Sequence, residues 1–217
     1  MVTDRIIAID GPAGAGKSTV ARAVAQCSGL PYLDTGAMYR CIALSVIRAG
    51  VDPSDETAVA RIAESARVDV DGTSVRLDGE DVSSVIRGTD VSSVVSAIAV
   101  HSRVRTAMRS QQQAWVAARG GAVVEGRDIS TVVFPNAVLK IFLTASAHER
   151  ARRRVDQVGG DIDETSAAIA ERDRIDSTRA DSPLRAAEGA VHIDSSSTTV
   201  EEVVAAICAE WKARCGG

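Results

Sequence analysis

Aromatic residues and lysines are both scarce in this chain of 217 residues. Phe, Trp and Tyr together make up 3% of the sequence, so a buried core must consist largely of Val, Ile, Leu and Ala. Only Lys17, Lys140 and Lys212 are lysines, and every other basic residue is arginine. Arginine suits two-pronged phosphate binding, but so uneven a ratio more often reflects genomic base composition. The ratio alone therefore assigns no function.

The chain also lacks long apolar runs and closely spaced cysteines. No apolar run approaches the roughly 18 residues of a membrane span, and the N-terminus reaches Asp4 and Arg5 without the apolar stretch of a signal peptide. The four cysteines are scattered, with no C-x-x-C pair and no histidine at metal-ligand spacing; they are Cys27, Cys41, Cys208 and Cys215. We therefore expect unpaired thiols in a soluble, cytoplasmic protein that does not contact membranes.

Overall charge and length narrow the class further. The formal net charge of −4 argues against a protein held to nucleic acid by bulk electrostatics, although a local basic pocket for a small anion is compatible with it. Apolar residues make up 45% of the chain, enough for a buried core. The length suits one compact domain, or one domain with inserted sub-domains, and we expect a monomer.

Short apolar segments alternate with helical stretches along the chain. This order predicts an α/β fold in which a parallel sheet is covered by helices. Helix starts are indicated by two capping-box patterns, at Ser146–Glu149 and Thr198–Glu201, and by Asp52 before Pro53. The predicted strands are Ile6–Ile9, Tyr32–Leu33, Val123–Val124, Val138–Leu143 and Val191–Ile193.

Two stretches interrupt this alternation. From Arg67 to Val82, polar and apolar residues alternate around two Asp-Gly turns, which predicts a small antiparallel meander inserted in the core. From Gly159 to Pro183 the chain is charged and interrupted by glycines, with a helical piece from Asp163 to Arg174.

One segment matches a phosphate-binding loop. Gly11-Pro-Ala-Gly-Ala-Gly-Lys-Ser18 fits the pattern G-x-x-x-x-G-K-[ST], between a strand and a helical run from Lys17 to Gln26. Backbone N–H groups of such a loop and the helix N-terminus bind phosphate oxygens. A solvated Lys17 would bridge the β- and γ-phosphates, and the Ser18 hydroxyl would ligate Mg²⁺. The predicted ATP-binding residues are Gly11, Pro12, Ala13, Gly14, Ala15, Gly16, Lys17, Ser18 and Thr19.

Other classes of phosphate-loop protein fit less well. A guanine-specific GTPase needs an Asn-Lys-x-Asp loop, but the only asparagine, Asn136, is followed by Ala137. Motor ATPases usually have an apolar strand that ends in Asp-Glu, whereas the candidate strand here ends Val-Glu-Gly-Arg127-Asp128. An arginine on this loop suits a phosphate-bearing acceptor better than a hydrolytic water. These features favour a kinase.

A second anion site is indicated after the second strand. Asp34-Thr-Gly-Ala-Met-Tyr-Arg40 opens a predicted helix that runs to about Ile47, and the N-terminus of a helix attracts anions. Arg40 lies about one turn into this helix, where its guanidinium can make a two-pronged contact with a phosphate. An ordinary N-cap with a solvent-facing arginine is the alternative.

These motifs together resemble the bacterial cytidylate kinases, and the resemblance covers nearly the whole chain. It rests on the phosphate-binding loop and on five further segments: Leu33–Arg40, Glu125–Ile129, Thr131–Pro135, Val138–Leu143 and Glu171–Arg179. It implies transfer of the γ-phosphoryl group of ATP to CMP or dCMP, with Mg²⁺. It also implies a core of residues 1–34, 106–156 and 185–217, a nucleoside-monophosphate-binding insertion over about 35–105 and a lid over about 157–184.

The same resemblance implies a role for each matching residue. Thr35 and Arg40 would bind the sugar and phosphate of the acceptor, Arg127 its phosphate, and Ser96, Arg105 and Asp128 the cytosine edge. Asp176 would bind the ribose hydroxyls from the lid, and Arg172 and Arg179 the phosphates. Lys17, Arg127, Arg172 and Arg179 would be the catalytic cations. Two positions depart from relatives: Ser130 stands where many have glycine, and Thr35 stands where some have serine.

Alternatives stay open at this point. The run from Arg172 to Asp176 also fits a solvated helix face held by ion pairs between neighbouring turns. Arg150–Arg154 fits a surface helix, either fully solvated or with one arginine near the ATP base. A kinase for another acceptor, such as UMP or shikimate, shares the phosphate loop. A shikimate-type acceptor would leave Ser96, Arg105 and Asp128 without a base to bind. A regulatory module that uses the loop as a switch is the alternative from another class.

Overall fold

The computed structural model describes residues 5–215 and divides into two compact units. Unit 1 comprises the residues up to Tyr32 and those from Gly120 onward, and unit 2 comprises Leu33–Arg119. The predicted insertion ends at residue 105, whereas unit 2 continues to Arg119, because helix α5 (Ser102–Arg119) packs against α3 (Glu56–Ser65). Among the described residues, no helix has the length and apolarity needed to cross a membrane.

A five-stranded sheet organises unit 1. Its strands occur in the order β2-β6-β1-β7-β8, and β1 pairs in parallel with both β6 and β7, while β7 pairs in parallel with β8. All five strands coincide with the segments predicted from the sequence: β1 (Ile6–Asp10), β2 (Tyr32–Asp34), β6 (Ala122–Gly126), β7 (Leu139–Thr144) and β8 (Val191–Asp194). The α/β prediction is confirmed.

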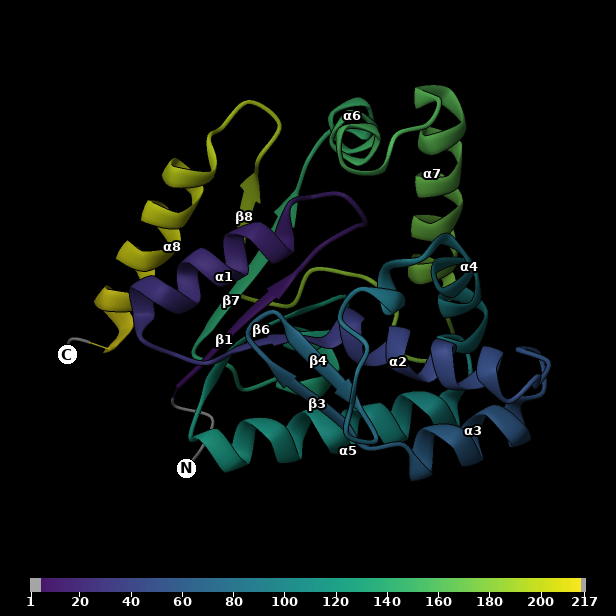
Figure 1. Cartoon of the computed structure of the whole chain (residues 1–217). Coiled ribbons are helices and arrows are strands. Elements are labelled where there is room, and N and C mark those ends of the chain that lie inside the picture. The colour runs from purple at the N-terminus through teal and green to yellow at the C-terminus, as the bar shows by residue number, and fades with distance from the viewer. Residues whose placement is uncertain (1–4, 216–217) are drawn as a thin grey trace. The chain divides into compact units, whose positions relative to one another are not determined.

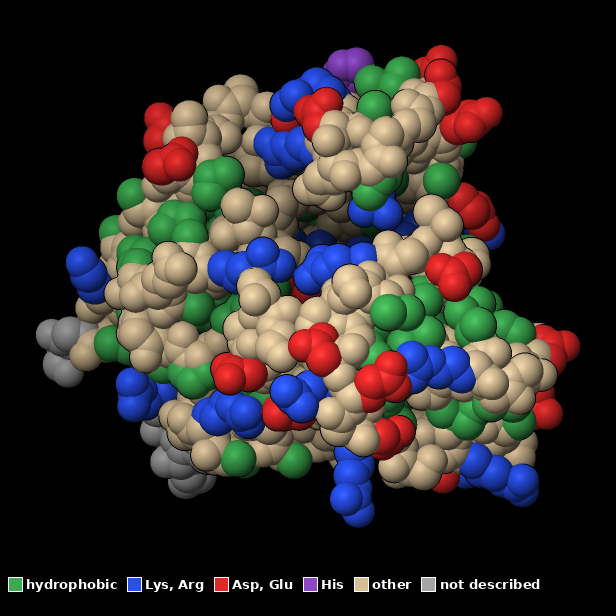
Figure 2. Space-filling view, viewed as in Figure 1, with side chains coloured by type: hydrophobic (Ala, Val, Ile, Leu, Met, Phe, Trp, Pro, Cys, Tyr) green, Lys and Arg blue, Asp and Glu red, His purple; other side chains and the backbone are tan. Residues whose placement is uncertain are grey.

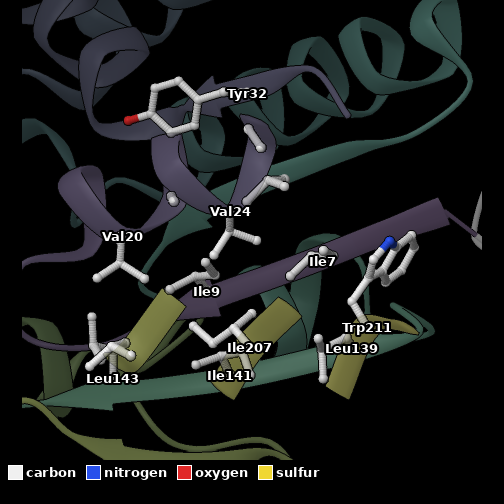
Figure 3. Close-up of a cluster of buried hydrophobic side chains, with 14 of the residues drawn as sticks. Ile7, Ile9, Val20, Val24, Tyr32, Leu139, Ile141, Leu143, Ile207 and Trp211 are labelled. Atoms are coloured by element: carbon white, nitrogen blue, oxygen red, sulfur yellow. The ribbon is translucent and has the colours of Figure 1, made fainter. Parts of the chain in front are cut away.

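Two helices pack side by side on one face of this sheet. They are α1 (Lys17–Ser28) and α8 (Val200–Cys215), as Figure 1 shows. Their apolar side chains meet those of β1 and β7 in the core, where Figure 3 shows Val20 and Val24 facing Ile9, Ile141 and their neighbours. This layer fixes the strand ends from which the phosphate-binding loop starts. Unit 1 also contains α6 (Ala147–Val158), α7 (Ile162–Thr178) and a π-helical turn over Ile129–Val133.

Cys27 and Cys208 join these two helices by a disulfide, with their Cα atoms 6.6 Å apart. The expectation of four unpaired thiols is therefore wrong for this pair, while Cys41 and Cys215 are free. A separation of 181 residues left no pairing signal in the sequence. The two cysteines meet only because α1 and α8 pack together.

Unit 2 combines helices with a small antiparallel sheet. Strands β3 (Val68–Asp71), β4 (Ser74–Leu77) and β5 (Glu80–Asp81) form the predicted meander. The Trp115 indole donates a hydrogen bond of 3.0 Å to the carbonyl of Val70, which links α5 to this sheet. Helix α2 (Thr35–Arg48) packs against α4 (Thr89–Ile98), and a 3₁₀ turn spans Val85–Arg87.

The structure corrects two of the predicted helix starts. Helix α3 is capped by Asp55, whose side chain accepts from the Ala58 N–H; Asp52 instead accepts from Ser54 within a turn. The capping box of α8 is formed by Thr199 and Glu202, one residue later than predicted. The predicted cap of α6 is confirmed, because the Ser146 hydroxyl accepts from the Glu149 N–H at 3.3 Å.

Candidate active site

The phosphate-binding loop lies between β1 and α1, as the sequence predicts. Gly11 is packed so tightly that a Cβ at this position would lie 2.0 Å from the Leu143 carbonyl oxygen. Gly16 has φ = +86°, in the left-handed region, and no side chain caps the N-terminus of α1 that it begins. The first N–H groups of α1 therefore offer donors to an anion, and the helix dipole favours negative charge there.

Lys17 is buried, contrary to the expectation of a solvated lysine. Its side chain is 7% exposed, and Nζ donates a hydrogen bond of 2.8 Å to the carbonyl of Pro12. The pKa of Lys17 is lowered to about 7, mainly by burial and then by the nearby positive charge of Arg127, with a smaller effect from Arg172. A phosphate group placed at this lysine would relieve this repulsion.

Side chains of α6 hold the phosphate-binding loop from outside. Arg150 donates to the carbonyl of Ala13 at 3.0 Å and forms an ion pair with Asp173 of α7. Arg153 donates to the hydroxyl and carbonyl of Ser195, and the Ser195 hydroxyl in turn donates to the carbonyl of Ala15 at 3.2 Å. Two arginines of the run therefore face inward, which the interpretation of Arg150–Arg154 as a surface helix does not predict.

Arg152 of the same run behaves as the surface interpretation predicts. Arg152 forms ion pairs of 2.8 and 2.9 Å with Glu149 and Asp156 along α6. On the face shown in Figure 2, basic and acidic side chains lie intermixed over this helix. The spacing of Arg150 and Arg153, three residues apart on one helix face, is the only signal in the sequence that could have marked them as a pair.

Asp176 lies at the centre of a cluster of arginines. It is 6% exposed and forms ion pairs of 2.9 Å with Arg127 and 3.1 Å with Arg179. The Asp176 pKa is lowered, because the positive charges of Arg127, Arg179 and Arg172 outweigh the effect of burial. The ion pair of Glu171 and Arg174, by contrast, lies on the solvated face of α7. The helix therefore presents one charged face to the protein and another to water.

Unit 2 carries four of the residues that the resemblance implies for the acceptor, of which Thr35 and Arg40 lie on α2. Thr35 is buried at the start of α2, where the Asp34 side chain caps the helix by accepting from Ala37 N–H at 2.9 Å. Arg40, one turn later, donates to the Ser92 hydroxyl at 2.7 Å. The solvent-facing alternative for this arginine is therefore wrong.

The residues of unit 2 that the resemblance implies for the base lie on α4 and α5. Ser96 follows Ser92 by one turn of α4 and so lies on the same face of the helix. Arg105 of α5 is 3% exposed, and its guanidinium lies 5.9 Å from the centre of the Tyr39 ring. Unit 2 thus places a buried guanidinium on α5 and two hydroxyl groups on α4, and both helices pack against α2.

A match to a known family spans both units. The model of the cytidylate kinase family matches residues 7–213. The chain belongs to the cytidylate kinase family. It is a transferase that passes the γ-phosphoryl group of ATP to CMP or dCMP.

Curated relatives agree with this family. The cytidylate kinase of Mycobacterium avium (strain 104) is 50% identical over 213 residues, which cover 94% of this chain and 93% of that protein. The cytidylate kinase of Mycobacterium leprae (strain Br4923) is 46% identical, with 99% of each chain covered. The bifunctional pantoate ligase/cytidylate kinase of Prochlorococcus marinus (strain MIT 9313) is 50% identical, and the matched region is 41% of that longer protein.

Solved structures of other proteins share the fold of this chain. A gluconokinase from Sinorhizobium meliloti 1021 matches 98% of the chain with a TM-score of 0.54 and 15% identity. The protein TT1252 from Thermus thermophilus matches 95% of the chain with a TM-score of 0.51 and 19% identity. At such low identity, these likenesses show the α/β fold alone.

Proposed function

We propose that phosphoryl transfer by this cytidylate kinase relies on the cations that surround Asp176 and Lys17 in unit 1. The carrying observation is that Arg127 and Arg172 both act electrostatically on the buried Lys17, while Arg127 and Arg179 pair with Asp176. Four cations thus belong to one electrostatic cluster next to the phosphate-binding loop. Transfer between two polyanions needs such fixed positive charge.

Each cation has a proposed task. Lys17 would leave the Pro12 carbonyl and bind the β- and γ-phosphates of ATP, while Arg127, Arg172 and Arg179 would bind phosphates of the donor and acceptor. Asp176 would hold the arginines in place and bind the ribose hydroxyls of CMP. The attacking oxygen already belongs to a phosphate anion, so positioning and charge neutralisation can replace a strong general base.

Ser18 is the proposed protein ligand of Mg²⁺. Within the described residues, no group of three or more His, Cys, Asp or Glu side chains could hold a metal. A single hydroxyl still fits Mg²⁺, which commonly takes one or two protein oxygens and completes its shell with water and substrate phosphates. Ser18 is the second residue of α1, next to Lys17. Bound with ATP, Mg²⁺ would neutralise charge on the β- and γ-phosphates.

Recognition of CMP is proposed for both loop and helix residues. Thr35 and Arg40 would bind the sugar and phosphate, and Ser96, Arg105 and Asp128 the cytosine edge. Cytosine presents an N4 amino donor and an N3 acceptor, whereas uracil presents an O4 acceptor and an N3–H donor. A carboxylate accepts from the cytosine amine but would face O4 of uracil, and a guanidinium that donates to N3 of cytosine would face the N–H of uracil.

These mismatches set the expected base preference. Each leaves a buried polar group without a partner, at a cost of about 1–3 kcal/mol. Together they would separate CMP from UMP by roughly 2–6 kcal/mol, on the order of 30- to 10⁴-fold in kcat/KM.

The test is the substitution Asp128→Asn, assayed on CMP and UMP. The amide adds a donor that can face O4 of uracil, so activity on CMP should fall and the CMP-to-UMP ratio should narrow. Asp156→Asn, on the exposed face of α6, is the matched control and should leave the ratio unchanged. If Asp128 only orders its loop, both activities will fall in equal proportion, and the base-binding assignment is lost.

Three further properties belong to this proposal. We infer a monomer that works in the cytoplasm, where its nucleotide substrates are found, and that does not bind nucleic acid. Light scattering should give the mass of one chain, 22.6 kDa. The mobile lid over about 157–184 is likewise a proposal, which rests on the charged segment that contains α7.

A further inference from the structure

One buried carboxylate connects two loops of unit 1: the phosphate-binding loop and the loop that carries Arg127 and Asp128. Asp10, the last residue of β1, is 0% exposed. Its Oδ1 accepts from the Ile129 N–H at 2.8 Å, and its Oδ2 accepts from the Ser130 N–H at 2.7 Å. The Ser130 hydroxyl also donates to Oδ2. Ser130 is itself buried, with 2% of its surface exposed.

The residues next to these in the sequence belong to the two proposed substrate-binding loops. Gly11, the first residue of the phosphate-binding loop, directly follows Asp10. Ile129 and Ser130 directly follow Arg127 and Asp128, the residues proposed to bind the phosphate and base of CMP. Strand pairing alone brings the loops no closer than the facing pair of Asp10 and Gly126, where β1 and β6 end.

The bonds to Asp10 are suited to rigid positioning. Burial is the largest influence on this carboxyl and raises the Asp10 pKa, while the bonds from Ser130 and Ile129 oppose it. Hydrogen bonds to a buried carboxylate are shorter and stronger than those between neutral groups. Two of the three donors are backbone N–H groups, which fix the course of the chain just after Asp128. The third donor is a side chain, the Ser130 hydroxyl, which a substitution can remove.

We propose that Asp10 and Ser130 are positioning residues, which hold the Arg127–Asp128 loop in register with the phosphate-binding loop so that CMP is aligned for in-line transfer. Neither side chain needs to touch a substrate. Misplacement by about 1 Å can cost on the order of 100-fold in rate, so one lost bond should be visible in kinetics. The inference rests on the proposed roles of Arg127 and Asp128.

The variant Ser130→Ala isolates the hydroxyl. It removes one bond to Asp10 and adds no bulk to a buried site. We expect the KM for CMP to rise about 3- to 10-fold, as for the loss of one hydrogen bond, with the KM for ATP within twofold of the wild type. The ratio of kcat/KM on CMP to kcat/KM on UMP should fall in parallel. Ser28→Ala is the control, because its hydroxyl bonds only to carbonyls within α1.

Two outcomes would overturn the positioning role. A purely structural serine would lower the unfolding temperature and the active fraction, while kcat per active enzyme and both KM values stay unchanged. Unchanged kinetics throughout would contradict the inference equally. A second measurement needs no variant: in the free wild-type enzyme, the amide protons of Ile129 and Ser130 should exchange slowly in NMR spectra, and fast exchange would contradict the bonds to Asp10.

Failure of this inference can be separated from failure of the proposed site. If Asp128→Asn narrows the CMP-to-UMP ratio while Ser130→Ala leaves the KM for CMP unchanged, the base-binding role stands and positioning by Asp10 and Ser130 is wrong. If Asp128→Asn leaves the ratio unchanged, the premise fails and the inference fails with it. Both variants are measured in the full chain with the same coupled assay.

Discussion

The Asp173 carboxylate of α7 accepts a hydrogen bond of 3.1 Å from the backbone N–H of Ala13 in the phosphate-binding loop. This N–H is one of the donors expected to face ATP. An acidic side chain therefore occupies part of the loop, and Arg150 fixes it there by an ion pair. Nucleotide phosphates, which are also anions, would have to displace it.

Asp173→Ala should therefore tighten ATP binding. Without the competing carboxylate, the Kd for a non-hydrolysable ATP analogue should fall about 3- to 10-fold, the scale of one charge-assisted hydrogen bond. Glu171→Ala is the control on the same helix, because Glu171 pairs only with the exposed Arg174. Isothermal titration calorimetry measures the Kd of the ATP analogue for both variants. An unchanged or weaker affinity in Asp173→Ala would show that the contact does not compete with ATP.

Lys17→Ala should abolish transfer while the fold persists. Removing a fixed cation from the transition state should lower kcat by about 100-fold or more. The Lys17 side chain donates its hydrogen bond within the loop, to the Pro12 carbonyl, so the unfolding temperature should change little. Lys212→Ala, on the exposed side of α8, should leave both quantities at the wild-type value. Near-normal turnover of Lys17→Ala would remove the lysine from the site.

Hydrogen exchange tests the proposed lid. The amides of Gly159–Pro183 should exchange more slowly when ATP and CMP analogues bind together, because closure would bury charged groups that now face water. The strands β1 and β7 provide an internal reference that should not change. Equal exchange of the segment with and without ligands would leave α7 as a fixed helix of unit 1.

Thiol counting tests the disulfide. Unfolded without reductant, the chain should react with a thiol reagent at Cys41 and Cys215 only, because Cys27 and Cys208 are paired. In the folded protein, the exposed Cys215 should react first, since burial raises the pKa of the Cys41 thiol to about 12. Four reactive thiols in the unfolded chain would show that the disulfide is absent.

The sequence predicted the fold well where local pattern and packing agree. All five strands of unit 1 are short apolar segments, and the meander carries its own turn signals, so hydrophobic periodicity was enough to find them. Helix starts were less secure where two candidates lie close together. Thr198 and Thr199 both fit a capping box, and Asp52 and Asp55 both fit an N-cap. Only the packed helix decides between such neighbours.

The candidate site was harder to predict beyond its motifs. The phosphate-binding loop is local in sequence, so its residues could be named directly. Arg150, Asp173 and Asp10 were missed because each acts across a long stretch of chain, on Ala13 or on Ser130. A run of arginines on a helix does not show which face packs inward. Such contacts follow from the tertiary structure and carry no local signature.

A coupled assay of ADP release across acceptors tests the central claim most directly. With ATP and Mg²⁺ present, the wild-type enzyme should turn over steadily on CMP and dCMP, more slowly on UMP by roughly 30-fold or more in kcat/KM, and with AMP little above the rate without acceptor. ADP release that does not depend on a nucleoside monophosphate, or equal rates on CMP, UMP and AMP, would contradict the account.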